Sequence, residues 1–85
     1  MEDDWEVINK ARDWITYKNK KTGLIREDYS YGLVAYYDEN RMYHRLDGPA
    51  EIWSGKKCLW HYHGKHINCS SQEEFERLLR LKAFW

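Results

Sequence analysis

Polar and apolar side chains alternate through the middle of this chain, and aromatic or β-branched residues fill many of the apolar positions. Such alternation is typical of antiparallel β-strands, in which successive side chains point to opposite faces. Short segments containing Asn, Asp, Ser or Gly interrupt the pattern and predict turns at 19–23, 38–40 and 54–55. The expected strands span residues 13–18, 24–29, 33–37, 41–44, 50–53 and 57–63. We therefore predict an antiparallel β-meander over residues 13–66.

The spacing at the N-terminus is different and favours a short helix over residues 1–12. Asp3 or Asp4 can accept backbone hydrogen bonds there, as helix N-caps do. Apolar side chains then recur at helical intervals, at Trp5, Ile8 and Ala11.

The last segment predicts an amphipathic helix over residues 70–85. Ser70 and Ser71 each precede a glutamate by three residues, which is the spacing of a capping box. Cations late in the segment suit the negative end of the helix dipole. The expected apolar face consists of Phe75, Leu78, Leu79, Leu81, Phe84 and Trp85.

Together these elements predict a single α+β domain over residues 1–85. It is an antiparallel β-meander of hairpins, with the C-terminal helix packed on one face and the short N-terminal helix at an end. A chain of 85 residues buries only a small core, so large side chains must fill it. We expect most of that core from Val34, Ile52, Trp53, Leu59, Trp60, Phe75, Leu78 and Leu79.

The most distinctive segment lies between two aromatic strands and reads His44-Arg45-Leu46-Asp47-Gly48-Pro49-Ala50. Gly48 permits backbone angles that other residues avoid, and Pro49 fixes its own φ. These residues therefore predict a rigid corner that leads into the next strand. We expect Arg45 to hold the corner by pairing with Asp47, and His44 and Asp47 to orient one another.

This run resembles the His-Arg-x-Asp-Gly-Pro-Ala motif of small hairpin-repeat proteins that are common in bacteriophage genomes. The likeness extends over about residues 26–65, although the family's Asn-Gly-Lys ending reads His63-Gly64-Lys65 here. A weaker internal echo supports two degenerate hairpin repeats, because Arg26-Glu27-Asp28 precedes a glycine much as Arg45-Leu46-Asp47 does. Only one full copy of the motif is present, so the resemblance implies a compact domain rather than a long array.

The resemblance to T-even-like phage accessory proteins also implies a function. Small proteins of this kind often bind and disable host defence proteins, including the RNase toxins of toxin–antitoxin systems. The resemblance therefore implies a non-enzymatic anti-defence protein whose partner is a host defence or toxin protein. In one version of this interpretation, RNA bridges the two proteins. The implied location is the cytoplasm of the bacterial host.

The formal net charge is zero, which argues against a simple polyanion binder, yet the charges are segregated. Acidic residues crowd residues 1–6 and 73–76 and leave the segment between them basic. Candidate contacts to nucleic-acid phosphates, with tyrosines nearby to stack on bases, are Lys18, Lys20, Lys21, Arg26, Lys56, Lys57 and Lys65. An RNA-binding module acting on transcripts is therefore one alternative function, and a virion or assembly component is another. The structural interpretation is that lysines at hairpin tips serve solubility alone.

Five residues of the types that bind zinc lie close together: Cys58, His61, His63, His66 and Cys69. Strand alternation places His61 and His63 on the face opposite Cys58, which favours half-exposed strand histidines over a metal site. A Cys–His catalytic pair would need a deeper pocket than a chain of hairpins this small is expected to form. We therefore predict no enzyme activity, no cofactor and no bound metal.

Aromatic residues make up 16% of the chain, which is more than a small core can hide. The surplus predicts a binding surface. An exposed edge strand could also pair with a partner or a second copy, so a homo-oligomer stays open as an alternative. No apolar run is long enough to span a bilayer, and we expect no membrane association.

Overall fold

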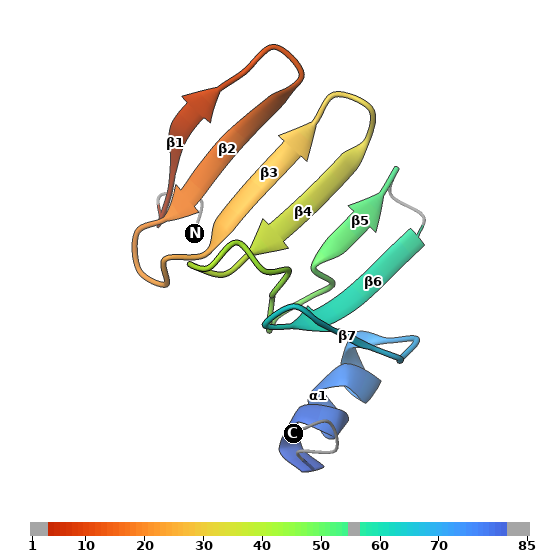
Figure 1. Ribbon diagram of the computed structural model, residues 1–85. Helices are drawn as coiled ribbons and strands as arrows, with labels where there is room; N and C mark the ends of the chain where they lie inside the picture. The colour runs from red at the N-terminus through yellow and green to blue at the C-terminus, as the bar shows by residue number, and fades with distance from the viewer. Residues whose placement is uncertain (1–3, 55–56, 82–85) are drawn as a thin grey trace.

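Seven antiparallel strands form one sheet in which each strand pairs with its neighbours in sequence, and a helix follows the last strand (Figure 1). The computed structural model describes residues 4–54 and 57–81. The elements are β1 (Trp5–Lys10), β2 (Trp14–Asn19), β3 (Ile25–Tyr29), β4 (Leu33–Tyr37), β5 (Glu51–Trp53), β6 (Lys57–Tyr62), β7 (Lys65–Ile67) and α1 (Gln72–Leu81). The predicted α+β class and the antiparallel β-meander are confirmed at this level.

The predicted N-terminal helix is wrong over the described residues, because Trp5–Lys10 forms strand β1 and pairs with β2. The pairing register shifts between Val7 and Asn9, which marks a β-bulge. A bulge adds one residue to one strand and so interrupts the alternation by which a strand is recognised in a sequence. A helix this short also gains little stability in water, whereas β2 offers backbone hydrogen-bonding partners.

Of the strand predicted over residues 41–44, only an isolated antiparallel bridge between Tyr43 and Tyr37 forms, because a loop held by Asp38 takes the place of the rest. The Oδ1 atom of Asp38 accepts the backbone N–H groups of Asn40 (2.9 Å) and Met42 (3.0 Å). Arg41 between them adopts a φ of 65°. Side-chain hydrogen bonds of this kind satisfy backbone groups that a strand would otherwise pair, so the chain turns instead.

Strand β7 is an element that the alternation did not reveal. It pairs antiparallel with β6, from Trp60↔Ile67 to Tyr62↔Lys65. Its three residues are too few to distinguish a strand from a turn by alternation alone. These residues form a strand because β6 presents one free edge, and the chain that follows β6 pairs with that edge.

Helix α1 begins where the serines predict. The Oγ atom of Ser71 accepts the backbone N–H of Glu74 (3.1 Å), and the Glu74 carboxylate accepts the backbone N–H of Ser70 (2.9 Å). These bonds satisfy N–H groups that the first turn of a helix leaves without partners. The helix packs at the β6–β7 end of the sheet rather than across one of its faces (Figure 1).

A hydrophobic core cluster lies at that same end of the sheet, and further buried apolar residues lie in and beside β4: Leu33, Ala35, Tyr36 and Ala50. Phe75 is fully buried against Trp60 and Ile67, and the partly buried residues around this cluster are Cys58, Tyr62, Cys69, Leu78 and Leu79. Trp60 and Phe75 are therefore core residues as predicted. Trp53 is not, because its side chain is 38% exposed on the open sheet. The other predicted core residues, Val34, Ile52, Leu59, Leu78 and Leu79, are partly buried.

Most of the sheet is a single layer, and rows of side chains cover its two faces. On one face the Arg26 guanidinium lies over the rings of Tyr17 (5.7 Å) and Tyr36 (5.8 Å), which are its partners across β2 and β4. On the other face the buried Glu27 carboxylate accepts hydrogen bonds from Thr16 Oγ1 (3.0 Å) and Tyr29 Oη (2.6 Å). Cross-strand pairs of this kind stabilise a sheet where no second layer packs on it.

Some expectations fall on residues outside the described part of the chain: Asp3 as a helix cap, Gly55 of the β5–β6 turn, Lys56, and the helix-face residues Phe84 and Trp85. Between residues 4 and 81, with 55–56 left aside, no helix has the length and apolar character needed to cross a membrane.

The fold predicts that Trp60→Ala lowers the free energy of unfolding by about 3–5 kcal/mol, the usual range for truncating a buried aromatic residue. Trp60 is 8% exposed, and its Nε1–H donates to Gln72 Oε1 of helix α1 (2.8 Å). Truncation therefore creates a cavity and leaves an acceptor without its donor. Urea denaturation measures the change, and Trp53→Ala is the matched control with a smaller expected loss. Equal losses for the two variants would contradict the burial of Trp60.

Candidate functional site

A pocket of about 720 Å³ lies where the β2–β3 turn, the loop between β4 and β5, and the β6–β7 turn meet. Trp5, Arg26 and Tyr36 reach it from three strands, and His44 and Arg45 reach it from the loop. The distinctive motif of the sequence therefore lines this cavity.

Tyr36 is the central aromatic side chain of this pocket and is only 6% exposed. The Arg45 guanidinium carbon lies 4.0 Å from its ring centroid, and that of Arg26 lies 5.8 Å away. Trp5 meets the same ring edge-on at 6.2 Å. Two cations and a second aromatic side chain thus converge on one buried ring, an arrangement that cation–π attraction favours.

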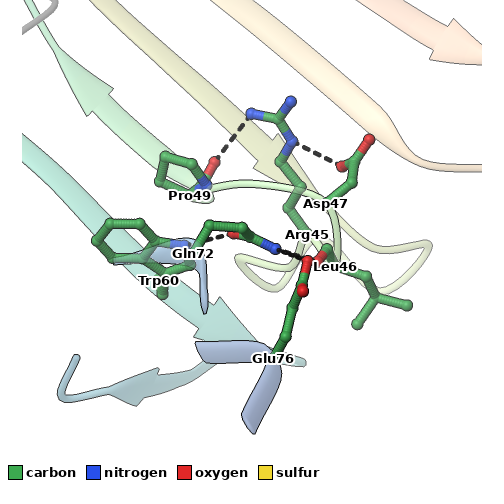
Figure 2. Close-up of polar contacts among 7 residues, drawn as sticks. All are labelled: Arg45, Leu46, Asp47, Pro49, Trp60, Gln72 and Glu76. Atoms are coloured by element: carbon green, nitrogen blue, oxygen red, sulfur yellow. Dashed lines mark hydrogen bonds and ion pairs between the residues drawn. The ribbon is translucent and has the colours of Figure 1, made fainter. Parts of the chain in front are cut away.

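The two arginines are held by matching ion pairs. Arg45 Nε–H donates to Asp47 Oδ1 (2.9 Å), and Arg45 Nη1–H donates to the carbonyl of Pro49 (3.2 Å), as Figure 2 shows. Arg26 donates to both oxygens of Asp28 (2.6 and 3.0 Å), and this hydrogen bonding raises the pKa of Arg26. The predicted Arg45–Asp47 pair is therefore confirmed. The two Arg-x-Asp segments of the internal echo make the same contact on the same ring.

Helix α1 holds the motif loop from the other side. Gln72 Nε2 donates to the carbonyl of Leu46 (2.9 Å) and to Glu76 Oε2 (2.9 Å), while its Oε1 accepts the Trp60 indole N–H (Figure 2). The core and the motif loop are therefore connected through one amide side chain.

Gly48 has a different role from the predicted one. Its φ is not positive, so the corner does not need the left-handed conformation that glycine permits. A Cβ at this position would lie 2.6 Å from Cζ and 2.8 Å from Nη1 of Arg45. Gly48 is needed because the guanidinium packs directly against its backbone.

His44 contacts His63 instead of orienting Asp47, which corrects another prediction. The His63 backbone N–H donates to His44 Nδ1 (2.9 Å), and the two rings stack with centroids 3.8 Å apart. A nitrogen that accepts a hydrogen bond carries no proton, so neutral His44 has its proton on Nε2. Burial, together with the neighbouring His63, lowers the pKa of His44 from its ordinary value of 6.5.

Asp38 completes this cluster, because its Oδ2 atom lies 2.7 Å from His63 Nδ1. Burial alone raises the pKa of the Asp38 carboxyl, but hydrogen bonds from His63 and from the backbone N–H groups of Met42 and Asn40 lower it further than burial raises it. Asp38 is therefore ionised at neutral pH. The Asp38–His63 pair joins the β6–β7 turn to the loop after β4 and fixes one wall of the pocket.

The predicted basic residues do not form one surface. Lys18, Lys20 and Lys21 line a shallower groove of about 550 Å³ around the β2–β3 turn, and Arg26 lines the adjoining pocket. Lys57 pairs with Trp53 beside the β5–β6 turn, at the opposite end of the strands, and Lys65 begins β7 (Figure 1). The first predicted cluster therefore lies beside the pocket, whereas Lys57 and Lys65 of the second lie at opposite ends of β6.

The face of the sheet opposite the pocket carries an aromatic row that the sequence analysis did not identify. Ring centroids are 5.9 Å apart from Trp14 to Tyr29, 5.4 Å from Tyr29 to Tyr31, and 6.3 Å from Tyr31 to Trp53. Trp14, Tyr31 and Trp53 are 37%, 61% and 38% exposed. The contact between Trp14 and Tyr29 follows from the observed β2–β3 pairing, and the contact with Trp53 depends on β4 and β5.

The candidate zinc ligands are separated in the structure. Cys58 packs into the Trp60 cluster, whereas His61 lies on the other face of β6 with its Nε2 atom 2.7 Å from Glu51 Oε2. Over residues 4–54 and 57–81, no three His, Cys, Asp or Glu side chains are grouped so that they could hold a metal ion.

No protein-family model, no curated protein and no solved structure matches this chain. The resemblance to the bacteriophage hairpin-repeat proteins therefore rests on the motif residues themselves.

The low pKa of His44 predicts that the protein loses stability as the pH falls below about 6.5. His61 acts in the same direction, because burial lowers its pKa despite the hydrogen bond to Glu51. Below this pH the two histidines bind protons in the unfolded chain but not in the folded one. The free energy of unfolding therefore falls by up to about 1.4 kcal/mol per pH unit for each histidine. We expect His44→Asn, which keeps an acceptor for the His63 N–H, to lose less stability between pH 7.5 and pH 5 in urea denaturation. Identical pH slopes for the variant and the natural protein would contradict this account.

The contact between Gly48 and Arg45 predicts that Gly48→Ala lowers the free energy of unfolding by about 1–3 kcal/mol, the range for overpacking. The added methyl group must displace a guanidinium that Asp47, Pro49 and Tyr36 hold in place. The same substitution in an Arg45→Ala background should cost at least about 1 kcal/mol less, because the clash is gone. Thermal or urea denaturation of the natural protein, the two single variants and the double variant gives the four free energies of unfolding of this double-mutant cycle. If the losses of the two single variants add up in the double variant, the contact with Arg45 is not the reason for glycine at position 48.

Proposed function

We propose that this chain is a non-enzymatic accessory protein that binds and inhibits a host defence factor, most specifically an RNase toxin of a toxin–antitoxin system. The observation that supports binding is the exposed aromatic row of Trp14, Tyr29, Tyr31 and Trp53. The target class comes from the resemblance of the His44–Ala50 motif to bacteriophage repeat proteins. The site of action in this proposal is the bacterial cytoplasm.

The aromatic row has the composition of a protein-binding hot spot. Trp and Tyr are the residue types that most often dominate such interfaces, because each offers a large apolar surface with a polar edge. A contiguous patch of this kind on a small protein commonly marks an interaction site. The row lies on a flat sheet, where several rings can meet a partner surface at once.

Two carboxylates hold the row in place before any partner arrives. Tyr29 Oη donates to Glu27 Oε1 (2.6 Å), and Trp53 Nε1–H donates to Glu51 Oε1 (3.1 Å). Rings that are already ordered lose less conformational entropy on binding.

The proposal predicts that this protein rescues bacterial growth from at least one RNase toxin, and that Tyr31→Ser combined with Trp53→Ser abolishes the rescue. Each toxin of a panel is induced with and without the protein, and growth and the affinity of the purified pair are measured. We expect the double variant to bind at least tenfold more weakly, because two partly exposed anchors are removed.

The matched control is Trp5→Leu, since Trp5 is also a partly buried tryptophan but lies in the pocket on the opposite face. It should retain rescue and affinity. If the Tyr31→Ser/Trp53→Ser variant rescues growth as well as the natural protein does, the interface does not lie on the aromatic row. If no toxin of the panel is rescued and no stoichiometric host protein binds, the proposed inhibition is wrong.

A further inference from the structure

We propose that the pocket around Tyr36 and the adjoining lysine groove bind a single-stranded polynucleotide, with one base in the pocket and its neighbouring phosphates along the β2–β3 turn. This site lies on the opposite side of the sheet from the aromatic row and does not depend on the proposed toxin inhibition. The shared chemistry is a planar base next to a charged phosphate, which RNA and single-stranded DNA both offer.

The pocket has the components that stack on a base. Trp5 supplies an aromatic surface, and the guanidinium planes of Arg26 and Arg45, which rest on the buried Tyr36 ring, supply cationic ones. Bases that are free of a duplex stack on both kinds of surface. Asp28 and Asp47 hold the two guanidiniums at fixed angles, so their positions do not have to be ordered by the ligand.

The groove places phosphate-binding cations within reach of a base in the pocket. Lys18, Lys20 and Lys21 line the groove, and four residues line both cavities: Asn19, Thr22, Gly23 and Glu39. The turn that joins them is rigid, because Asn19 Oδ1 accepts the backbone N–H groups of Lys21 (2.9 Å) and Thr22 (3.0 Å). A strand that leaves the pocket over this turn therefore meets the three lysines in succession.

Carboxylates on the same surface limit the strength of the interaction. Asp38 and Asp47 are paired with His63 and Arg45, whereas Glu39 stands where the two cavities meet and Glu6 lines the groove. The exposed Lys21 also has a partly buried partner, with its Nζ atom 3.8 Å from Asp4 Oδ2. We therefore expect modest affinity with strong salt dependence, in which base stacking contributes a large share.

Fluorescence anisotropy with labelled RNA and DNA oligomers of about ten nucleotides tests the site. We expect Trp5→Leu and Lys20→Gln/Lys21→Gln each to weaken binding at least tenfold. Trp5→Phe should retain it, because a ring that stacks is still present. The matched controls are Trp53→Leu and Lys57→Gln, which remove the same residue types at the far end of the strands and should change affinity less than twofold.

The salt dependence gives an independent readout. Three lysine–phosphate contacts to a single strand predict a slope of about −2 for log K against log salt concentration. The slope should become about −0.7 in Lys20→Gln/Lys21→Gln, which keeps only Lys18. Circular dichroism melts of each variant establish that it is folded before binding is measured.

Binding of RNA alone or of both polymers with this variant pattern supports the site, and the RNA-to-DNA ratio tells whether the 2′-hydroxyl is read. No binding to either polymer at about 0.1 mM, weaker than typical non-specific nucleic-acid binding, overturns the proposal. Equal losses for Lys57→Gln and Lys20→Gln/Lys21→Gln also overturn it. Neither result bears on toxin rescue, which is measured through the other face.

Discussion

A sheet that lacks a second layer must cover its own faces, and this requirement governs the whole molecule. Among the residues that the structure describes, only the β6–β7 end has a helix against it (Figure 1), and there Phe75 packs on Trp60 and Ile67. Elsewhere, long side chains lie flat across neighbouring strands and shield one another. Arginines over tyrosine rings, a tyrosine bonded to a carboxylate and a row of neighbouring aromatic rings replace the apolar core of a two-layer protein.

The same covering explains why aromatic and cationic side chains reach the surface on both sides of so small a protein. Side chains that cover a sheet by lying along it stay partly exposed, as Trp53 and Tyr31 do. At one end of the sheet the loops and these side chains together form a pocket. Tyr36 lies in this pocket beneath the guanidinium groups of Arg26 and Arg45. The groups that stabilise the sheet are therefore also the groups that a partner would contact.

Buried carboxylates are the cost of this design, and two of them, Glu27 and Asp38, hold a row of side chains and a loop in place. Glu27 binds Thr16 and Tyr29, and Asp38 binds His63 together with the turn that follows β4. Such bonds are directional, so they set positions that apolar packing alone would leave loose. They also make the protein sensitive to acid, since His44 is held neutral within the pocket wall.

By itself, the sequence determined the features that depend on near neighbours. The central strands, the turn closed by Gly23, the Ser71 cap of α1 and the Arg45–Asp47 pair all follow from residues within a few positions of one another. Tertiary structure decided the rest. β1 is a strand because β2 lies beside it, Gly48 is small because Arg45 folds over it, and Trp53 is exposed because no layer covers β5. The pocket and the aromatic row bring together residues from strands that are distant in sequence. The alternation of polar and apolar residues predicts the face to which a side chain points, but it does not predict which other side chains cover that face.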